Sequence, residues 1–185
     1  MSDNNKKAKR IDYSRGPIHE FLGGYQKDIK NLSKQLILSQ LGKTEEDMKK
    51  SKSIENIVNA ETDKHMRTYF NSNGTLKEGY FGVVALNGNA NTEAAGYLIA
   101  SEHKDHVEYN YLYVDTNKRK KNFGYGLITG IEDIERTRNK TRPKKLNIKF
   151  HVSDKEDKLI KLFRHKSYDI RQSHKEGDVC VSKTI

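Results

Sequence analysis

Residues 109–134 place the strongest limit on how this chain can fold. An alternating apolar pattern up to Val114 predicts a strand, and an amphipathic helical pattern begins directly after the glycine-bearing stretch 122–126. At the start of such a helix the first backbone N–H groups have no intrahelical acceptor and carry positive partial charge. Glycine lets phosphate oxygens approach these groups closely. The segment therefore predicts a binding site for the pyrophosphate of a cofactor.

Length and composition predict a single intracellular domain. A chain of 185 residues suits one domain, which we expect over residues 18–185, after a flexible polar tail over residues 1–17. The sequence contains no apolar run of about 18 residues, and its polar N-terminus does not resemble a secretory signal. Cys180 is the only cysteine, so neither an intrachain disulfide nor a cysteine-based zinc site can form. These features predict a cytoplasmic protein with no membrane span.

The order of the periodic segments predicts an α/β fold. The second helical segment has a break signal near Ser51. Three consecutive strands predict an antiparallel meander, and the strand–helix–strand unit that follows predicts a mixed sheet. The expected order is two helices, three strands, a helix, a strand, a helix and two short strands, over residues 25–41, 44–66, 80–86, 94–100, 107–114, 127–134, 146–152, 159–163, 168–170 and 179–181.

At residues 121–126 the sequence Lys-Asn-Phe-Gly-Tyr-Gly resembles the cofactor motif of the GCN5-related N-acetyltransferase superfamily. That motif is Arg/Gln-x-x-Gly-x-Gly/Ala, between a strand and a helix. Residues 162–163 and 167–168 match the late leucine–tyrosine and glycine–phenylalanine positions of the family, and the element order from about residue 24 onward also matches. Two departures stand out: Lys121 replaces Arg or Gln, and the loop over residues 114–124 is about two residues longer than usual.

The resemblance implies a mixed, mostly antiparallel sheet of about six to seven strands with a central splay, flanked by about four helices. It implies acetyl-CoA as cofactor and direct transfer of the acetyl group to a primary amine, either a protein lysine, an N-terminus or a small molecule. Many members of the family are dimers, so a homodimer is also consistent with it. The cofactor-binding residues that it implies are Leu112, Tyr113, Val114, Lys121, Asn122, Phe123, Gly124, Tyr125, Gly126 and Leu127.

Glu108 is the candidate general base. In the histone-acetyltransferase branch of the family a glutamate at the matching offset takes the proton of the attacking ammonium, and a carboxylate suits that task. Counting with a period of two places Glu108 on the same strand face as Asn110, Leu112 and Val114. The alternative is a solvent-facing glutamate on a half-buried strand.

The protonation of the thiolate leaving group is less clear from the sequence. The resemblance implies a tyrosine in the last helix, but Phe163 occupies that position and has no proton to give. Tyr168 or a water molecule are the candidate replacements, and His151 is a further candidate acid or base. A plain strand histidine is the commoner role for His151. Weak or absent catalysis is also consistent with Phe163.

The net charge of +10 predicts attraction to polyanions. Residues 118–121 are four consecutive cations that are suited to the phosphates of a cofactor. A second basic cluster is either a solvated face or a surface for nucleic acid or an acidic protein, and it supports an alternative function as a non-catalytic binding module. This cluster consists of Arg136, Arg138, Lys140, Arg142, Lys144 and Lys145.

Other functions have weaker support in the sequence. The glycine stretch matches neither the nucleoside-triphosphate motif nor the dinucleotide motif. Tyr109, Tyr111 and Tyr113 form an alternating series that is suited to base stacking, but tyrosines in strands more often pack in a core. Of the seven histidines, His103, His106 and His151 fall near strand ends, and their spacing does not predict a metal site.

Overall fold

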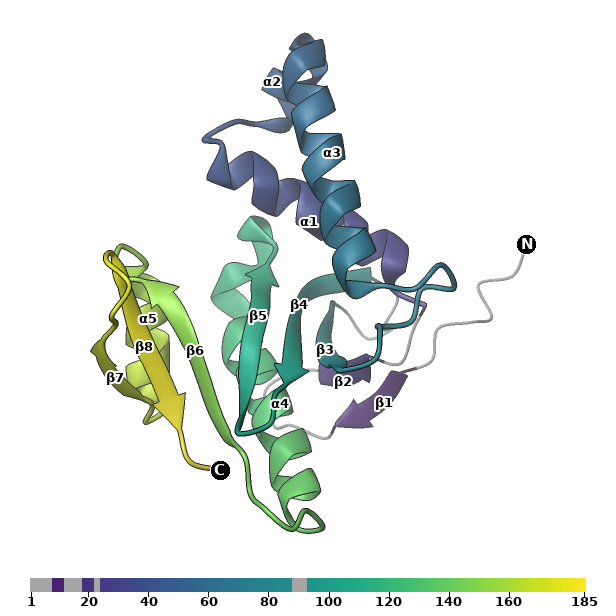
Figure 1. Ribbon diagram of the computed structural model, residues 1–185. Helices are drawn as coiled ribbons and strands as arrows, with labels where there is room; N and C mark the ends of the chain where they lie inside the picture. Colours follow the sequence, from purple (N-terminus) through teal and green to yellow (C-terminus); the bar gives the residue numbers. More distant parts are fainter. Residues whose placement is uncertain (1–7, 12–17, 22–23, 88–92) are drawn as a thin grey trace.

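The computed structural model describes residues 8–11, 18–21, 24–87 and 93–185, and it contains one eight-stranded mixed sheet (Figure 1). The strand order is β1-β2-β3-β4-β5-β6-β8-β7, and every neighbouring pair is antiparallel except β5 and β6. The elements are β1 (Ala8–Ile11), β2 (Ile18–Phe21), α1 (Gln26–Gln40), α2 (Glu45–Lys50), α3 (Lys52–Tyr69), β3 (Tyr80–Asn87), β4 (Glu93–Glu102), β5 (His106–Val114), the 3-10 helix η1 (Thr116–Lys121), α4 (Phe123–Asn139), β6 (Asn147–Ser153), α5 (Asp157–His165), β7 (Asp169–Gln172) and β8 (Asp178–Lys183).

The predicted fold class, a mixed and mostly antiparallel sheet flanked by helices, is confirmed, and so is the order of the elements from residue 25 onward. The break near Ser51 separates two helices, because the Ser51 side chain accepts a hydrogen bond from the Ile54 amide and caps α3. β1 lies inside residues 1–17, where the sequence predicts a polar tail. The sheet has eight strands rather than the expected six to seven, because β1 and β2 have four residues each, too few for a clear periodic signal.

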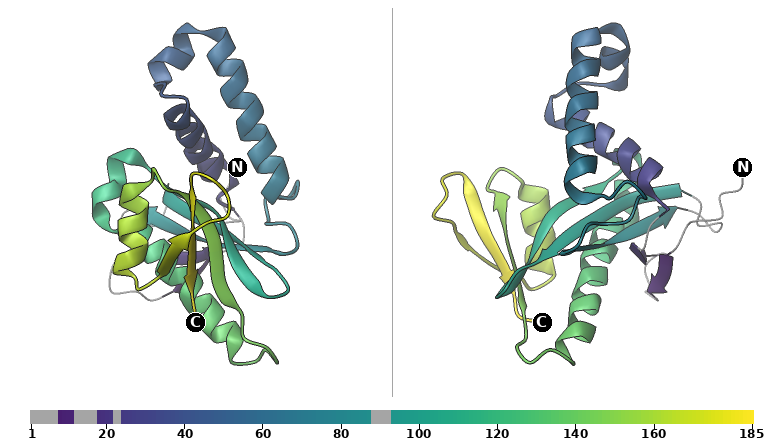
Figure 2. Two further views of the ribbon diagram at one scale, coloured as in Figure 1. Left: turned by 60° about the vertical axis from the view of Figure 1, so that its left-hand side comes forward. Right: turned by 45° about the vertical axis from the view of Figure 1, so that its right-hand side comes forward.

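Helices cover both faces of the sheet (Figure 2). On one face, Leu127, Ile128 and Ile131 of α4 are fully buried and pack in a core that also contains Leu98 of β4. On the other face α1 and α3 contribute residues such as Ile29 to a second core. α2 and the adjoining end of α3 project beyond the sheet (Figure 1). Among the described residues no helix is long and apolar enough to cross a membrane.

The sheet divides between its two central strands. β5 and β6 pair only at His106 with Asn147 and at Val107 with Ile148. Beyond these pairs the two strands diverge, so that β6, β8, β7 and α5 form a group that turns away from β5 (Figures 1 and 2). β6 keeps its antiparallel pairing with β8 along residues 148–153. The central splay that the family resemblance implies is thus a feature of this fold.

His65 of α3 lies in the second core, and its burial predicts that the stability of the fold depends on pH. It is 6% exposed, and its Nε2 atom is 3.2 Å from the Tyr97 hydroxyl. Its ring packs edge-on against the Tyr111 ring, with the ring centroids 4.2 Å apart. Burial lowers the pKa of His65 from 6.5 to about 4. The surrounding phenols stay protonated at and below neutral pH, so they add no charge there.

Acidification should therefore destabilise the fold through His65. A histidine whose pKa is depressed by folding must be neutral in the folded state, and its contribution is present above about pH 6.5 and is lost as the pH falls toward 4. We expect a loss of about 3 kcal/mol between pH 7 and pH 4. Urea unfolding of the wild type and of His65→Gln at both pH values gives the free energy of unfolding of each protein. The contribution of His65 is the amount by which the wild type loses more stability than the variant between pH 7 and pH 4. The exposed control His174→Gln should lose as much stability as the wild type. An equal loss in His65→Gln and the wild type would contradict this assignment.

Candidate functional site

The start of α4 lies beside the end of β5. Asn122 has a left-handed conformation (φ 58°) and turns the chain into the helix. The Gly126 amide donates to the Asn122 carbonyl at 3.0 Å. The amides of Phe123 and Gly124 precede this bond and therefore have no acceptor within the helix. Gly124 is half-exposed, whereas Gly126 is buried. The predicted order of strand, loop and glycine-bearing helix start is therefore confirmed.

Three elements meet at Gly124. A Cβ atom built on Gly124 would lie 3.6 Å from Cδ2 of Leu162 in α5 and 3.9 Å from Cγ2 of Val114 in β5. Both distances are ordinary van der Waals contacts, so the fold has room for a methyl group there. The helix start, the end of β5 and the last helix thus border one place next to the splay.

The predicted cofactor-binding residues differ in what they expose. Leu112 and Val114 are half-buried and pack against the core under α4, whereas Tyr113 is buried on the opposite face. Phe123 and Leu127 are buried core residues, so only their backbone could contact a ligand. The Tyr125 ring lies under Lys166, with Nζ 4.1 Å from the ring centroid. The side chain of Lys121 lies outside the described residues, so its predicted contact stays a prediction.

A β-bulge at Asn110 changes which residues share a face of β5. Tyr109 pairs with Ala100 and Tyr111 with Ile99, so Asn110 is an extra residue between them. Tyr109 consequently packs in the core under α4, while Tyr111 and Tyr113 face α1 and α3. The expected core packing of the tyrosines is confirmed, but on two faces, because period-two counting holds only for an uninterrupted strand. Asparagine is depleted in strands, and this was the available signal.

The bulge also corrects the predicted face of Glu108. Glu108 pairs with Ser101, and Tyr109 beside it shares a face with Leu112 and Val114. Glu108 therefore lies on the opposite face from Leu112 and Val114, toward α3. It is the first residue of β5 after the last pair with β6. The splay begins where this carboxylate is located.

The Glu108 carboxylate is accessible and lies close to an imidazole. Its side chain is 36% exposed, and its Oε2 atom is 3.2 Å from Nε2 of His103. His103 Nε2 is also 3.0 Å from the Ser101 hydroxyl. Burial is the main reason that the pKa of Tyr69 on α3 is raised to about 12, and the negative charge of Glu108 adds to the effect. A carboxylate in this position can accept a proton from a group that enters between β5 and α3.

Tyr168 has a different environment. It is 5% exposed, its hydroxyl is 2.9 Å from the Tyr109 hydroxyl, and burial raises its pKa well above the usual range. Phe163 is fully buried beside it, with ring centroids 5.1 Å apart. His151 is exposed on β6 and pairs in register with Cys180 of β8. The geometry therefore assigns Tyr168 and Phe163 to the core.

Much of the second basic cluster is paired within the molecule. Arg142 contacts Glu135, which is fully buried, and Glu102. Arg138 also pairs with both carboxylates, and Arg136 pairs with acids of its own helix. In the first cluster, Lys118 is paired with Glu93 at 3.1 Å and with Asp115 at 3.6 Å. These ion pairs give the arginines of the second cluster a role within the fold, which the sequence analysis did not consider.

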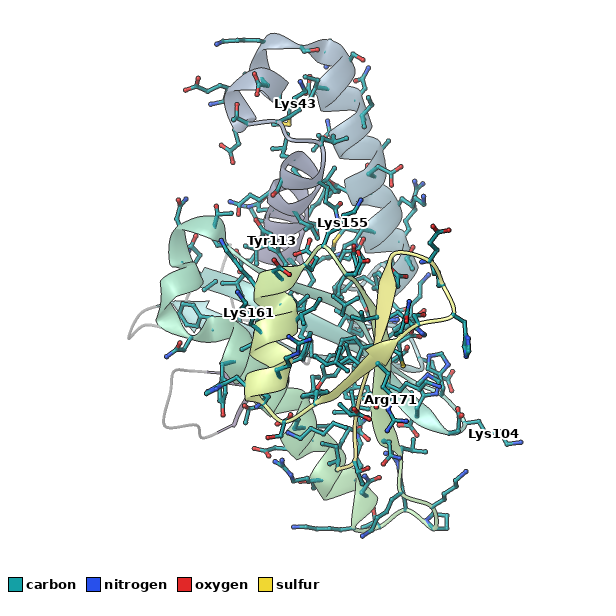
Figure 3. The ribbon with its side chains drawn as sticks, turned by 90° about the vertical axis from the view of Figure 1, so that its left-hand side faces the viewer. Lys43, Lys104, Tyr113, Lys155, Lys161 and Arg171 are labelled. Atoms are coloured by element: carbon teal, nitrogen blue, oxygen red, sulfur yellow. The ribbon has the colours of Figure 1, made fainter. Side chains whose placement is uncertain are left out.

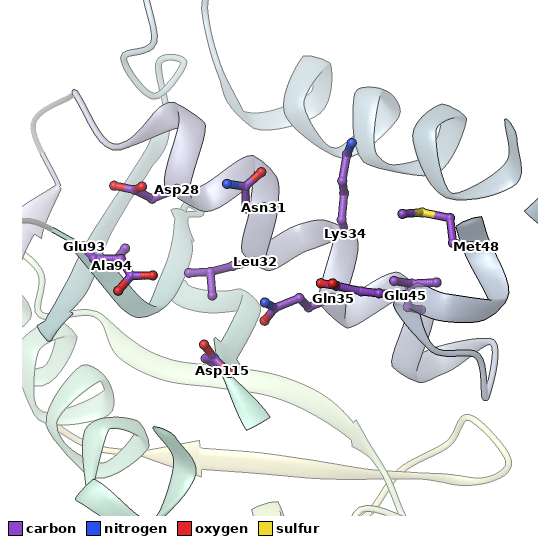
Figure 4. Close-up of a pocket in the computed structure, with 11 residues that line it drawn as sticks. Asp28, Asn31, Leu32, Lys34, Gln35, Glu45, Met48, Glu93, Ala94 and Asp115 are labelled. Carbon is purple, nitrogen blue, oxygen red and sulfur yellow. The ribbon is translucent and has the colours of Figure 1, made fainter. Parts of the chain in front are cut away.

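A cavity of about 230 Å³ lies between α1, α2 and the end of β5 (Figure 4). Four carboxylates line it, those of Asp28, Glu45, Glu93 and Asp115, and Gln35 contributes a buried Oε1 atom with no hydrogen-bond partner among the described residues. Asp115 is seven residues after Glu108, which separates the two by about 20 Å along the strand. The cavity and Glu108 are therefore separate features.

A cluster of two histidines and a glutamate was missed by the sequence analysis. His103, His106 and Glu108 each offer a ligand atom, and these atoms lie within 4.8 Å of one another. The spacing appeared uninformative because the histidines flank a turn. The turn folds β5 back along β4 and brings all three together.

Comparisons with known proteins identify the fold. No family model and no curated protein matches the sequence. Among solved structures, PaiA N-acetyltransferase from Thermoplasma acidophilum in complex with coenzyme A aligns with a TM-score of 0.61 and 12% identity, covering 91% of this chain and 99% of that chain. The GNAT domain of S. lividans PAT aligns with a TM-score of 0.53 and 16% identity, covering 66% of this chain and 68% of that chain. At these identities the similarity establishes the fold alone: this chain has the fold of the GCN5-related N-acetyltransferases.

Proposed function

We propose that the protein is an acetyl-CoA-dependent N-acetyltransferase that acts on a primary amine. One observation carries the proposal: β5 and β6 separate beyond Val107, beside the start of α4. The first hydrogen bond of this helix is from Gly126 to Asn122, so the amides before Gly126 have no acceptor within the helix. This combination supplies a place for an extended arm next to a strand and an anion site at its end. The solved PaiA structure of the same fold contains coenzyme A.

The residues around the splay fit such a cofactor. The backbone amides of Phe123 and Gly124 would hold the pyrophosphate, and the backbone of β5 over residues 110–114 would hold the pantetheine arm. Asn110 offers a buried Oδ1 atom with no hydrogen-bond partner among the described residues, which suits an amide donor of a ligand. Acetyl-CoA supplies an activated acyl thioester. Backbone N–H groups of β5 near Leu112 would stabilise negative charge on its carbonyl oxygen.

Glu108 is the proposed general base. An amine is protonated at neutral pH, and it becomes a nucleophile only after it loses a proton. Glu108 is accessible, lies where the splay begins, and faces α3, which would border the acceptor. The direct attack that we propose needs no covalent enzyme intermediate. Water rather than Tyr168 would protonate the leaving thiolate, because the Tyr168 hydroxyl is bonded to Tyr109 and its pKa is raised.

The ion pairs of α4 and of the loop that follows it count against the alternative of a non-catalytic nucleic-acid module. A binding surface for phosphates needs cations that are available to the ligand. Arg136, Arg138 and Arg142 contact carboxylates of this chain instead. Lys140, Lys144 and Lys145 remain exposed, which is common for a solvated face.

Replacement of Gly124 by alanine should separate cofactor binding from stability. The added methyl fits the fold, and alanine favours a helix over glycine by up to about 1 kcal/mol, so the stability should be equal or higher. The same methyl would occupy space at the proposed pyrophosphate site. We expect acetyl-CoA binding to weaken at least about tenfold, or about 1.4 kcal/mol, by calorimetric titration. Unchanged affinity would remove Gly124 from the site.

Acetyl transfer itself can be tested without knowledge of the acceptor. The protein is incubated with radiolabelled acetyl-CoA in separate reactions, each with one source of amines: a lysate, a lysine-rich peptide or small polyamines. We expect label in at least one amine, dependent on the protein. Salt-sensitive retention of nucleic acid with no labelled product would instead support the non-catalytic alternative.

A further inference from the structure

The turn between β4 and β5 presents three metal-ligating side chains on one short segment. The ligand atoms of His103, His106 and Glu108 all lie within 4.8 Å of one another. His103 Nε2 and Glu108 Oε2 are 3.2 Å apart. Two ligands of a tetrahedral zinc ion with bonds of about 2.0–2.2 Å are separated by about 3.3 Å. This pair therefore already has the spacing of two ligands of one ion.

The turn holds the two histidines in place before any ion binds. The His103 amide donates to the His106 carbonyl at 2.8 Å, which closes the turn. The two imidazole rings stack with their centroids 4.7 Å apart and an interplanar angle of 13°. Ligands on a rigid hairpin lose little conformational freedom on binding, which favours affinity.

Asp105 provides the outer partner that metal-bound histidines commonly have. Its Oδ1 atom is 2.8 Å from Nδ1 of His106. When Nδ1–H donates to this carboxylate, Nε2 of His106 carries the lone pair that a metal needs. The carboxylate also makes the imidazole a stronger donor.

The cluster is open to solvent. The side chains of His103 and His106 are 44% and 25% exposed, so an ion can enter and water can complete its coordination. Lys104, between the two histidines, points away from the sheet (Figure 3). Its positive charge is therefore directed away from the molecule.

We propose that His103, His106 and Glu108 bind a divalent first-row transition ion, and that the bound ion inhibits acetyl transfer. Two imidazoles and one carboxylate are a donor set that zinc accepts, with a position left for water. A carboxylate bound to the ion is no longer available to take a proton from an amine. The inhibition rests on the proposed role of Glu108, whereas the binding of the ion does not.

The binding is tested by titrating Zn²⁺ into the full-length, untagged protein in a non-chelating buffer, with heat as the readout. We expect one site per chain, with affinity weakened at least about tenfold in His103→Gln and in His106→Gln. The exposed His174→Gln variant should bind as the wild type does. Circular dichroism of each variant checks its fold. Equal affinity in the wild type and the double variant His103→Gln/His106→Gln would overturn the site.

The inhibition is tested separately, as the ratio of transfer rates with and without Zn²⁺ in each protein. We expect the ion to lower the rate of the wild type at least about tenfold at saturation. In the double variant His103→Gln/His106→Gln, which lacks both imidazole ligands, the ratio at the same concentration should be close to one. Zinc that binds at the cluster without changing the rate would overturn the regulatory half. Absence of any transfer by the metal-free protein would instead count against the proposed function, and the calorimetric result would still decide the site.

Discussion

Replacement of Glu108 by glutamine is expected to reduce the turnover of acetyl transfer by about 10²- to 10⁴-fold. Glutamine has the same size, and it can occupy the same position beside His103, whose Nε2 atom lies 3.2 Å from the carboxylate. It cannot accept the proton of an ammonium group at neutral pH. The loss should appear in kcat, measured as release of free thiol at saturating acetyl-CoA. The affinity for acetyl-CoA should stay the same, because the proposed pyrophosphate site is at Gly124.

The control for Glu108→Gln is Glu176→Gln, which removes an exposed carboxylate from the turn between β7 and β8. Its turnover should equal that of the wild type. A Glu108→Gln variant with wild-type kcat would show that the base is another group, or that an unprotonated amine is the substrate form. In either case Glu108 would be a surface residue of β5.

Replacement of Glu132 by alanine is expected to lower the free energy of unfolding by about 3–5 kcal/mol. Glu132 is 2% exposed, and its carboxylate lies 3.0 Å from Lys166 Nζ and 2.9 Å from Lys183 Nζ. Alanine would leave Lys166, itself 7% exposed, as a buried cation without this carboxylate. The interaction joins α4 to α5 and β8, so the C-terminal part of the sheet should become less stable. Urea denaturation measures the change.

Asp133→Ala is the matched control, because it removes a carboxylate from the next position of the same helix. Asp133 is 37% exposed, and its ion pair with Arg136 lies at the surface. Such pairs contribute about 0–1 kcal/mol. If Glu132→Ala were no more destabilising than Asp133→Ala, the buried ion pairs would not be what fixes α5 and β8 against α4.

The sequence predicted features that depend on local patterns. The alternation of β5 and the glycines after Asn122 located the strand, the loop and the helix start, because each signal is contained within a few residues. The order of strands and helices limited the fold to a mixed sheet for the same reason. The helix start beside Val114 followed from this order.

Features that depend on distant or irregular contacts were not predicted. The bulge at Asn110 shifts the faces of β5 by one residue, and its register is set by pairing with β4. Arg142 finds Glu102, forty residues away, only after β4 and α4 have packed together. The exposure of Tyr168 also depends on tertiary packing, which a single sequence does not contain.

The metal-binding cluster illustrates how a turn hides a site. His103, His106 and Glu108 have spacings of three and two residues, which match no common motif for a metal site. The hairpin reverses the chain between Glu102 and His106 and places the three side chains on one side. Such an arrangement becomes visible only when the turn and the register of both strands are known.

Structure determination of the protein with coenzyme A tests the central claim most directly. We predict that the ligand lies between β5 and β6, with its pyrophosphate at the amides of Phe123 and Gly124 and its thiol near the bulge at Asn110. Coenzyme A bound elsewhere, or no binding at millimolar concentration, would contradict the account.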